Sequence, residues 1–124
     1  WDGGVLEYSL DGGTTWTDIL AAQGGVAANP NRFLTGGYAS GALNASGNPL
    51  AGRAAWRGVS TGFASAWLNT RVNLTDFAGR ELRLRFRFGS DGSIGDAGWW
   101  IDAVEVSRQT ACDGLDTVFR NGFE

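Results

Sequence analysis

The sequence predicts an all-β, antiparallel sandwich of the jelly-roll type. Three observations favour this class: short segments alternate apolar with polar residues, Gly- and Asp-rich turns separate them, and no window of about 11 residues shows helical periodicity. A chain of 124 residues is long enough for one domain with two packed layers. We expect the sandwich over residues 1–107, with one incomplete sheet edge, and a polar tail over residues 108–124.

The clearest strand is expected over residues 81–88. Four apolar residues alternate there with three arginines without a break: Leu82, Leu84, Phe86 and Phe88 with Arg83, Arg85 and Arg87. Such alternation is typical of a strand with one face in the core and the other in water. We therefore expect the apolar side chains to face inward and the arginines to face outward.

A hairpin is expected near the N-terminus. Residues 5–10 alternate, the sequence Asp11-Gly12-Gly13 signals a tight turn, and residues 14–20 form the returning strand. The segment from Ser9 to Trp16 resembles the Asp-box of sialidases, where the Asp hydrogen-bonds turn amides. The resemblance implies a turn stapled by Asp11 rather than an enzyme, because a propeller needs several copies and the chain has one.

Further strands are expected over residues 54–60, 67–74 and 99–107, with a turn over residues 75–79. Residues 21–52 form a long stretch rich in Gly, Ala, Asn and Ser. Loops of this length are usually functional or mobile in compact domains. Four apolar residues nevertheless indicate that it packs against the body: Phe33, Leu34, Tyr38 and Leu43.

The composition excludes several classes of function. The chain has no histidine, so it has neither a histidine-based zinc site nor a Ser-His-Asp triad, and we expect no catalysis. A net charge of -3, with arginines dispersed among apolar residues, disfavours nucleic-acid binding. No apolar run approaches the roughly 20 residues of a membrane span. Because methionine is absent, we expect a processed product or a piece of a longer protein, and the pairing of Cys112 stays open.

Motifs spread over residues 2–106 together resemble one family. They are Asp2 to Ser9, Asp11 to Gly13 with Trp16, Asn48 to Arg53 with Ala55-Trp56, Thr70 to Leu74, Leu82 to Arg87 and Gly98 to Asp102. Jointly they resemble the MAM-like jelly-roll modules on the C-terminal side of immune-inhibitor-A-type and other secreted bacterial peptidases. The resemblance implies a secreted, extracellular, non-catalytic module, covalently attached to a peptidase or another catalytic domain. Relatives usually carry one or two strands before the segment that begins here at Asp2, and they often have Asp where this chain has Ala103.

Asp102 is in phase with Trp100, Val104 and Val106, so we expect it to point inward, where a carboxylate needs a partner. Two interpretations stay open, a salt bridge or backbone hydrogen bonds on one hand and a structural Ca²⁺ site on the other. Calcium takes roughly six to eight oxygen ligands, which Gly- and Asp-rich loops supply. The candidate calcium ligands are Asp2, Glu7, Asp91, Asp96 and Asp102.

Aromatic side chains form a second candidate site. Exposed rings of carbohydrate-binding jelly rolls stack on sugars, and the two adjacent residues Trp99 and Trp100 point to opposite faces of a strand. The candidate ligand-binding cluster is Tyr38, Trp67 and Trp99. The alternative for these rings is core packing.

Three functions therefore stay open. The first is an accessory module of a secreted bacterial protein that aids stability or contacts a protein substrate. The second is a carbohydrate-binding module that contacts a glycan. The third is a self-assembling extracellular subunit, in which residues 117–123 fill an open sheet edge of the same or a neighbouring molecule. If residues 117–123 do not fill a sheet edge, the alternative is that the tail over residues 108–124 is flexible or serves as a sorting signal.

Overall fold

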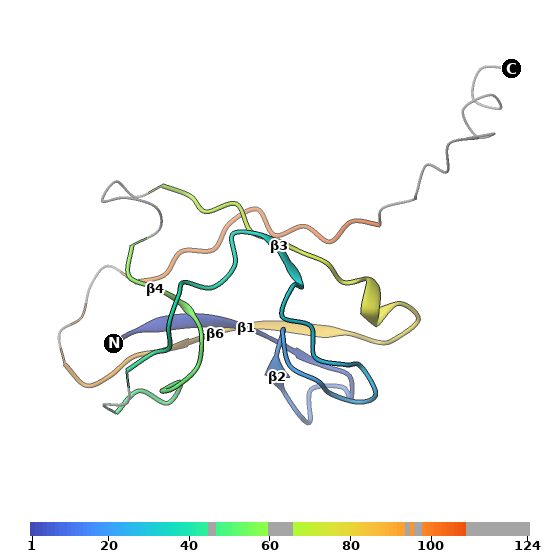
Figure 1. Cartoon of the computed structure of the whole chain (residues 1–124), viewed down its shortest axis with the longest axis horizontal. Helices are drawn as coiled ribbons and strands as arrows, with labels where there is room; N and C mark the ends of the chain where they lie inside the picture. The colour runs from blue at the N-terminus through green and yellow to red at the C-terminus, as the bar shows by residue number, and fades with distance from the viewer. Residues whose placement is uncertain (45–46, 60–65, 94, 96–97, 109–124) are drawn as a thin grey trace, which may run out of the picture.

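The computed structural model describes residues 1–44, 47–59, 66–93, 95 and 98–108 (Figure 1). Its regular elements there are β1 (Gly3–Ser9), β2 (Thr17–Asp18), β3 (Phe33–Thr35), β4 (Trp56–Arg57), β5 (Arg71–Val72), the 3₁₀ helix η1 (Thr75–Phe77) and β6 (Arg83–Gly89). All strand pairs are antiparallel. The prediction of an all-β, antiparallel sandwich is confirmed. The predictions for Cys112 and for residues 109–124 lie outside the described residues.

β1 is the central strand of the larger sheet. β6 pairs with all seven residues of β1, and β2 and β4 pair with its two ends. β3 and β5 form a second, two-stranded sheet, and β3 lies above the larger sheet in Figure 1. The predicted hairpin is therefore present as β1 and β2, although the returning strand is shorter than expected.

An apolar core fills the space between the two sheets. Its buried members are Leu6, Tyr8, Ile19, Val26 and Phe77. Three aromatic rings pack beside this core edge to face: Phe33, Tyr38 and Trp56 lie with ring centroids 4.8 to 5.4 Å apart. Because Phe33 belongs to β3 and Trp56 to β4, these rings join the two layers.

The opposite face of β1 is buried as well. Val5 packs there against Leu43, Leu50 and Ala55, which come from the long Gly-rich stretch and the segment after it. The stretch therefore packs against the body, as its apolar residues indicate. Cover on both sides explains why every residue of β1 is buried.

The side chains of β6 are buried differently from the prediction. Phe86 and Phe88 lie on the face that looks toward the second sheet, yet they remain 41% and 47% exposed. On the other face, Arg85 and Arg87 turn back toward the buried Glu7 of β1. By register, the apolar side chains and the arginines lie on opposite faces, as predicted. The predicted burial is wrong for this part of the strand: Phe86 and Phe88 are exposed, whereas Arg85 and Arg87 are partly buried because they pair with the Glu7 carboxylate.

Residues 99–107 do not form the expected strand. They lie in the upper layer of Figure 1 without regular structure. Trp100, Val104 and Val106 are exposed, and Asp102 is exposed too, so the prediction that Asp102 points inward is wrong. The physical reason is that a strand needs a hydrogen-bonded neighbour, and no strand within the described part of the chain pairs with this segment.

The other expected elements are shorter than predicted. The regions 54–60 and 67–74 contain only β4 and β5 as strands, each two residues long, and Ser60 lies outside the described residues. The expected turn after residue 74 contains η1. Short strands of this kind leave most of the packing to loops, so side-chain contacts position the candidate sites.

Candidate functional site

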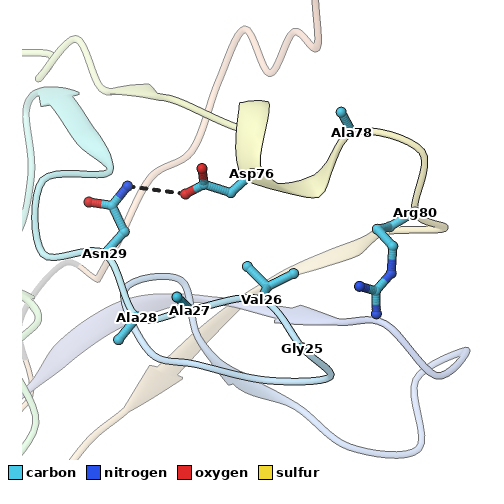
Figure 2. A pocket seen from close by; sticks show the side chains of 8 residues that line it. All are labelled: Gly25, Val26, Ala27, Ala28, Asn29, Asp76, Ala78 and Arg80. Carbon is cyan, nitrogen blue, oxygen red and sulfur yellow. Dashed lines mark hydrogen bonds between the residues drawn. The ribbon is translucent and has the colours of Figure 1, made fainter.

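A shallow pocket opens between η1 and the loop that precedes β3 (Figure 2). It is lined by Gly25, Val26, Ala27, Ala28, Asn29, Asp76, Ala78 and Arg80. Its charged groups already have partners, because the Asp76 carboxylate accepts hydrogen bonds from Asn29 and Arg32 at 3.1 and 3.0 Å. Arg80 donates to the backbone oxygen of Gly24. The pocket therefore offers no free reactive group among its lining residues.

Arg32 fastens this region to the core. Its side chain is fully buried, and its guanidinium lies 4.7 Å from the centre of the Phe77 ring. It donates to the backbone oxygens of Ile19 and Ala27 and forms the ion pair with Asp76. One side chain thus ties the segment after β2 to η1, which makes its role structural.

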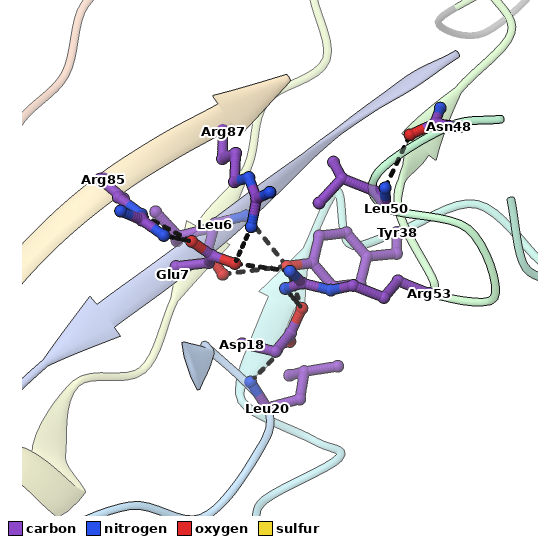
Figure 3. A network of polar contacts seen from close by, with 10 residues as sticks. All are labelled: Leu6, Glu7, Asp18, Leu20, Tyr38, Asn48, Leu50, Arg53, Arg85 and Arg87. Carbon is purple, nitrogen blue, oxygen red and sulfur yellow. Dashed lines mark hydrogen bonds and ion pairs between the residues drawn. The ribbon is translucent and has the colours of Figure 1, made fainter. Parts of the chain in front are cut away.

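A cluster of charged side chains lies on the arginine face of the larger sheet (Figure 3). Glu7, in the middle of β1, is buried. Its carboxylate accepts hydrogen bonds from Arg53 at 2.5 Å and from Arg85 at 2.6 Å. Arg87 lies 3.8 Å away. We call these four residues, together with Asp18, the Glu7 network.

Strand register and one loop bring the Glu7 network together. The pairing of β1 with β6 places Glu7 directly opposite Arg85, and cross-strand neighbours of opposite charge stabilise a sheet. Arg53 comes from the segment before β4, where its backbone bonds to Leu43 and Leu50 hold it in place. Arg53 also contacts Asp18 of β2 at 2.8 Å. The network therefore connects the hairpin of β1 and β2 with two distant segments, the one before β4 and β6.

Tyr38 extends the network into the core. Its hydroxyl accepts a hydrogen bond from the Leu6 amide at 3.0 Å, and it lies 3.1 Å from both the Leu6 oxygen and the Asp18 carboxylate. Burial, followed by the negative charge of Asp18, raises the pKa of Tyr38. The hydroxyl therefore stays protonated and acts as a fixed donor and acceptor.

Two opposing effects set the charge of Glu7. Burial raises its pKa, but hydrogen bonds and positive charge from Arg53 and Arg85 outweigh burial, and the pKa lies below its ordinary value. Glu7 is therefore ionised at neutral pH. An ionised carboxylate that is held by arginines is a poor general acid or base, so the network suits structural stabilisation.

This depressed pKa predicts an acid-sensitive contribution to stability. The contribution of Glu7 should be fully present above its ordinary pKa of 4.5 and should be lost as the pH falls through the lower pKa of the folded state. Urea unfolding of the wild type and of Glu7→Gln, measured between about pH 7 and pH 3, should show a difference in unfolding free energy that shrinks below about pH 4.5. A difference that stays constant down to about pH 3 would contradict this assignment.

The structure brings two of the five candidate calcium ligands together. The Asp91 amide donates to the Asp2 carboxylate at 2.9 Å, and the Asp91 carboxylate accepts bonds from the amide and hydroxyl of Ser93 at 2.9 and 2.6 Å. Both carboxylates therefore already have protein donors.

The other three candidate ligands lie elsewhere. Glu7 is bound by arginines, Asp102 is exposed and accepts a bond from the Ala103 amide, and Asp96 lies outside the described residues. Within the described ranges, no group of three or more His, Cys, Asp or Glu side chains has the arrangement of a metal site. Calcium binding stays a prediction.

Two of the three candidate aromatic residues belong to one continuous cluster. The Trp99 ring lies against Trp56, Phe86 and Phe88, with centroids 5.7, 5.8 and 6.4 Å away. Tyr38 contacts the same Trp56 ring at 4.9 Å. Trp67 is 67% exposed. Two of the rings thus contribute to packing, while the role of the three as a glycan site stays a prediction.

The absence of a side chain at Gly4 leaves room for the Trp99 ring. A Cβ built at Gly4 of β1 would lie 2.4 Å from the Trp99 ring, which is far closer than two carbon atoms can approach. The ring therefore lies flat against backbone that has no side chain. This close approach holds Trp99 in place although the segment that follows it has no strand partner among the described strands.

Comparison with known proteins finds a similarity that covers part of the chain. No protein-family model and no solved structure match the chain. The chain is similar to Bacillopeptidase F of Bacillus subtilis (strain 168), with 35% identity over 54 residues. The matched region covers 44% of this chain and 4% of that protein. In the described residues, no helix is long and apolar enough to cross a membrane.

Proposed function

We propose that the chain is a non-catalytic accessory module of an extracellular bacterial protein that also carries a peptidase domain. The observation that carries this proposal is the similarity to a small part of a much longer peptidase. An all-β sandwich that contributes a minor part of a large enzyme is typical of an accessory module. The MAM-like motifs over residues 2–106 favour the same function.

The chemistry of the chain supports a role without catalysis. The chain has no histidine, which is the side chain that most often transfers protons near neutral pH. Three carboxylates in the polar clusters described above are each paired with an arginine: Glu7, Asp18 and Asp76. Paired carboxylates of this kind stabilise a fold rather than react with a substrate.

Exposed apolar residues support a role in contact with macromolecules. Trp67, Trp100 and Val106 are each largely exposed. Large apolar side chains that stay exposed are available to pack against another macromolecule, where they would be removed from water. We propose that the module contacts the protein substrate or the neighbouring domain of the enzyme that carries it.

Deletion of the module from its parent enzyme tests this proposal. Hydrolysis of a folded protein substrate, or the half-life of the enzyme on heating, should fall. The kcat/KM for a short chromogenic peptide should stay unchanged, because the catalytic groups lie in another domain. The isolated chain should hydrolyse neither substrate. Hydrolysis by the isolated chain, or an equal loss on both substrates without a change in half-life, would refute the accessory role.

A further inference from the structure

β6 is an edge strand whose outer side is free among the described residues. Its inner side pairs with β1 in an unbroken register, and no other described strand pairs with it. At the end of the strand, the side chain of Asn48 donates to the backbone oxygens of Gly89 and Trp1 at 3.0 and 2.6 Å, so the proposal concerns residues 83–88. A strand edge of this kind presents unpaired N–H and C=O groups to a further strand.

One face of this edge is apolar. The register with β1 places Leu84, Phe86 and Phe88 on the same face. Trp99 contacts the two phenylalanine rings, yet both stay close to half exposed. A strand added beside β6 would place every second side chain over these rings and remove apolar area from water.

The other face of the edge is positively charged. Arg83, Arg85 and Arg87 share it by register. Arg85 and Arg87, together with Arg53, pair with two carboxylates on this face, Glu7 and Asp18, whereas Arg83 belongs to none of these ion pairs. Four positive charges against two negative charges leave the arginine face positive, and Arg85 and Arg87 have side chains that are 38% and 41% exposed.

We propose that the free edge of β6 binds an extended polypeptide segment that alternates apolar and acidic side chains, as an added β-strand. Its apolar side chains cover Phe86 and Phe88, and its acidic side chains lie beside the arginines. A second copy of β6 does not fit, because an antiparallel pair of these strands would set arginines beside arginines. The proposal goes beyond the accessory role, since it concerns the isolated chain whatever domain accompanies it.

Peptide titration of the full 124-residue chain tests the proposal. The probe is a peptide of alternating Val and Glu with Gly-Ser flanks, and its control replaces every Glu with Lys. In ¹⁵N NMR spectra the Glu peptide should perturb the amides of residues 83–88 and should bind at least about tenfold more tightly than the Lys peptide. A Glu peptide that is N-methylated at alternate positions should lose binding, because it cannot complete the strand pairing.

A charge reversal in the protein sharpens the test. Arg83→Glu should weaken binding of the Glu peptide and strengthen binding of the Lys peptide, while Arg71→Glu on β5 should change neither. Arg83 is suitable because its side chain is exposed and it lies outside the Glu7 network. The proposal is overturned by equal affinity for the two peptides, by binding that survives N-methylation, by perturbed amides that lie away from β6, or by no binding at all. None of these outcomes bears on attachment to a peptidase, so the two proposals fail separately.

Discussion

Glu7→Gln should lower the free energy of unfolding by about 3 kcal/mol. The neutral amide leaves Arg53 and Arg85 without the carboxylate that balances them in a buried part of the sheet. Removing one partner of a buried ion pair costs roughly 3–5 kcal/mol. We expect the lower end of that range because Arg85 and Arg87 remain partly in water. Urea unfolding followed by tryptophan fluorescence measures the change.

Glu81→Gln is the matched control for this substitution. Glu81 is exposed and lies just before β6, so its replacement makes the same chemical change without breaking the network. Exposed substitutions usually alter stability by less than about 0.5 kcal/mol. If the two variants lose the same stability, the Glu7 network does not stabilise the fold in the way described.

Arg32→Leu should lower the free energy of unfolding by a similar amount, about 3 kcal/mol. The substitution leaves the backbone oxygens of Ile19 and Ala27 without donors and removes the cation–π contact with Phe77. The Arg32 Nε–H is buried without a hydrogen-bond acceptor in the described structure, which is unfavourable in the folded state. Removing this group therefore offsets part of the loss of stability. The unpaired carbonyls and the lost packing outweigh this gain. Thermal and urea unfolding measure the net change.

Asp76→Asn separates the contribution of the ion pair from that of the buried donors. Asp76 is about half exposed, so water replaces the lost charge interaction. We expect this variant to lose much less stability than Arg32→Leu. A loss as large as that of Arg32→Leu would mean that the ion pair, rather than the backbone contacts of the guanidinium, fastens the loop to η1.

The hairpin could be predicted because its interactions are local. The Asp11 carboxylate accepts a bond from the Thr15 amide at 2.9 Å, and the Trp16 indole donates to the Gly13 oxygen at 2.9 Å. Gly12 and Gly13 both have positive φ, which the turn needs and which glycine adopts freely. Every partner lies within four residues, so residue type and spacing were sufficient.

The Glu7 network could not be predicted in the same way. Arg53 and Arg85 lie 46 and 78 residues from Glu7 in sequence. Alternation along a strand predicts which residues share a face, but it does not predict which other segment packs against that face. The pattern of β1 therefore does not reveal the segment that buries its polar face. The available signal is a glutamate between Leu6 and Tyr8, which the sequence pattern alone offers equally as a calcium ligand.

The expected strand over residues 99–107 illustrates a related limit. Its alternation describes a segment that is able to pair, whereas pairing itself depends on a neighbour. In the described structure the neighbour is absent, and the apolar side chains of Trp100, Val104 and Val106 remain exposed. The sequence pattern therefore shows that this segment is able to form a strand, but it does not show that the segment does so.

The contact between Gly4 and Trp99 restricts how related sequences can diverge. A side chain at position 4 would displace the indole and remove its contacts with Phe86 and Phe88. A smaller residue at position 99 would leave a void over the bare backbone. Substitutions at these two sites are therefore tolerated only in compensating pairs, and the two positions should covary across homologues although 94 residues separate them in the chain.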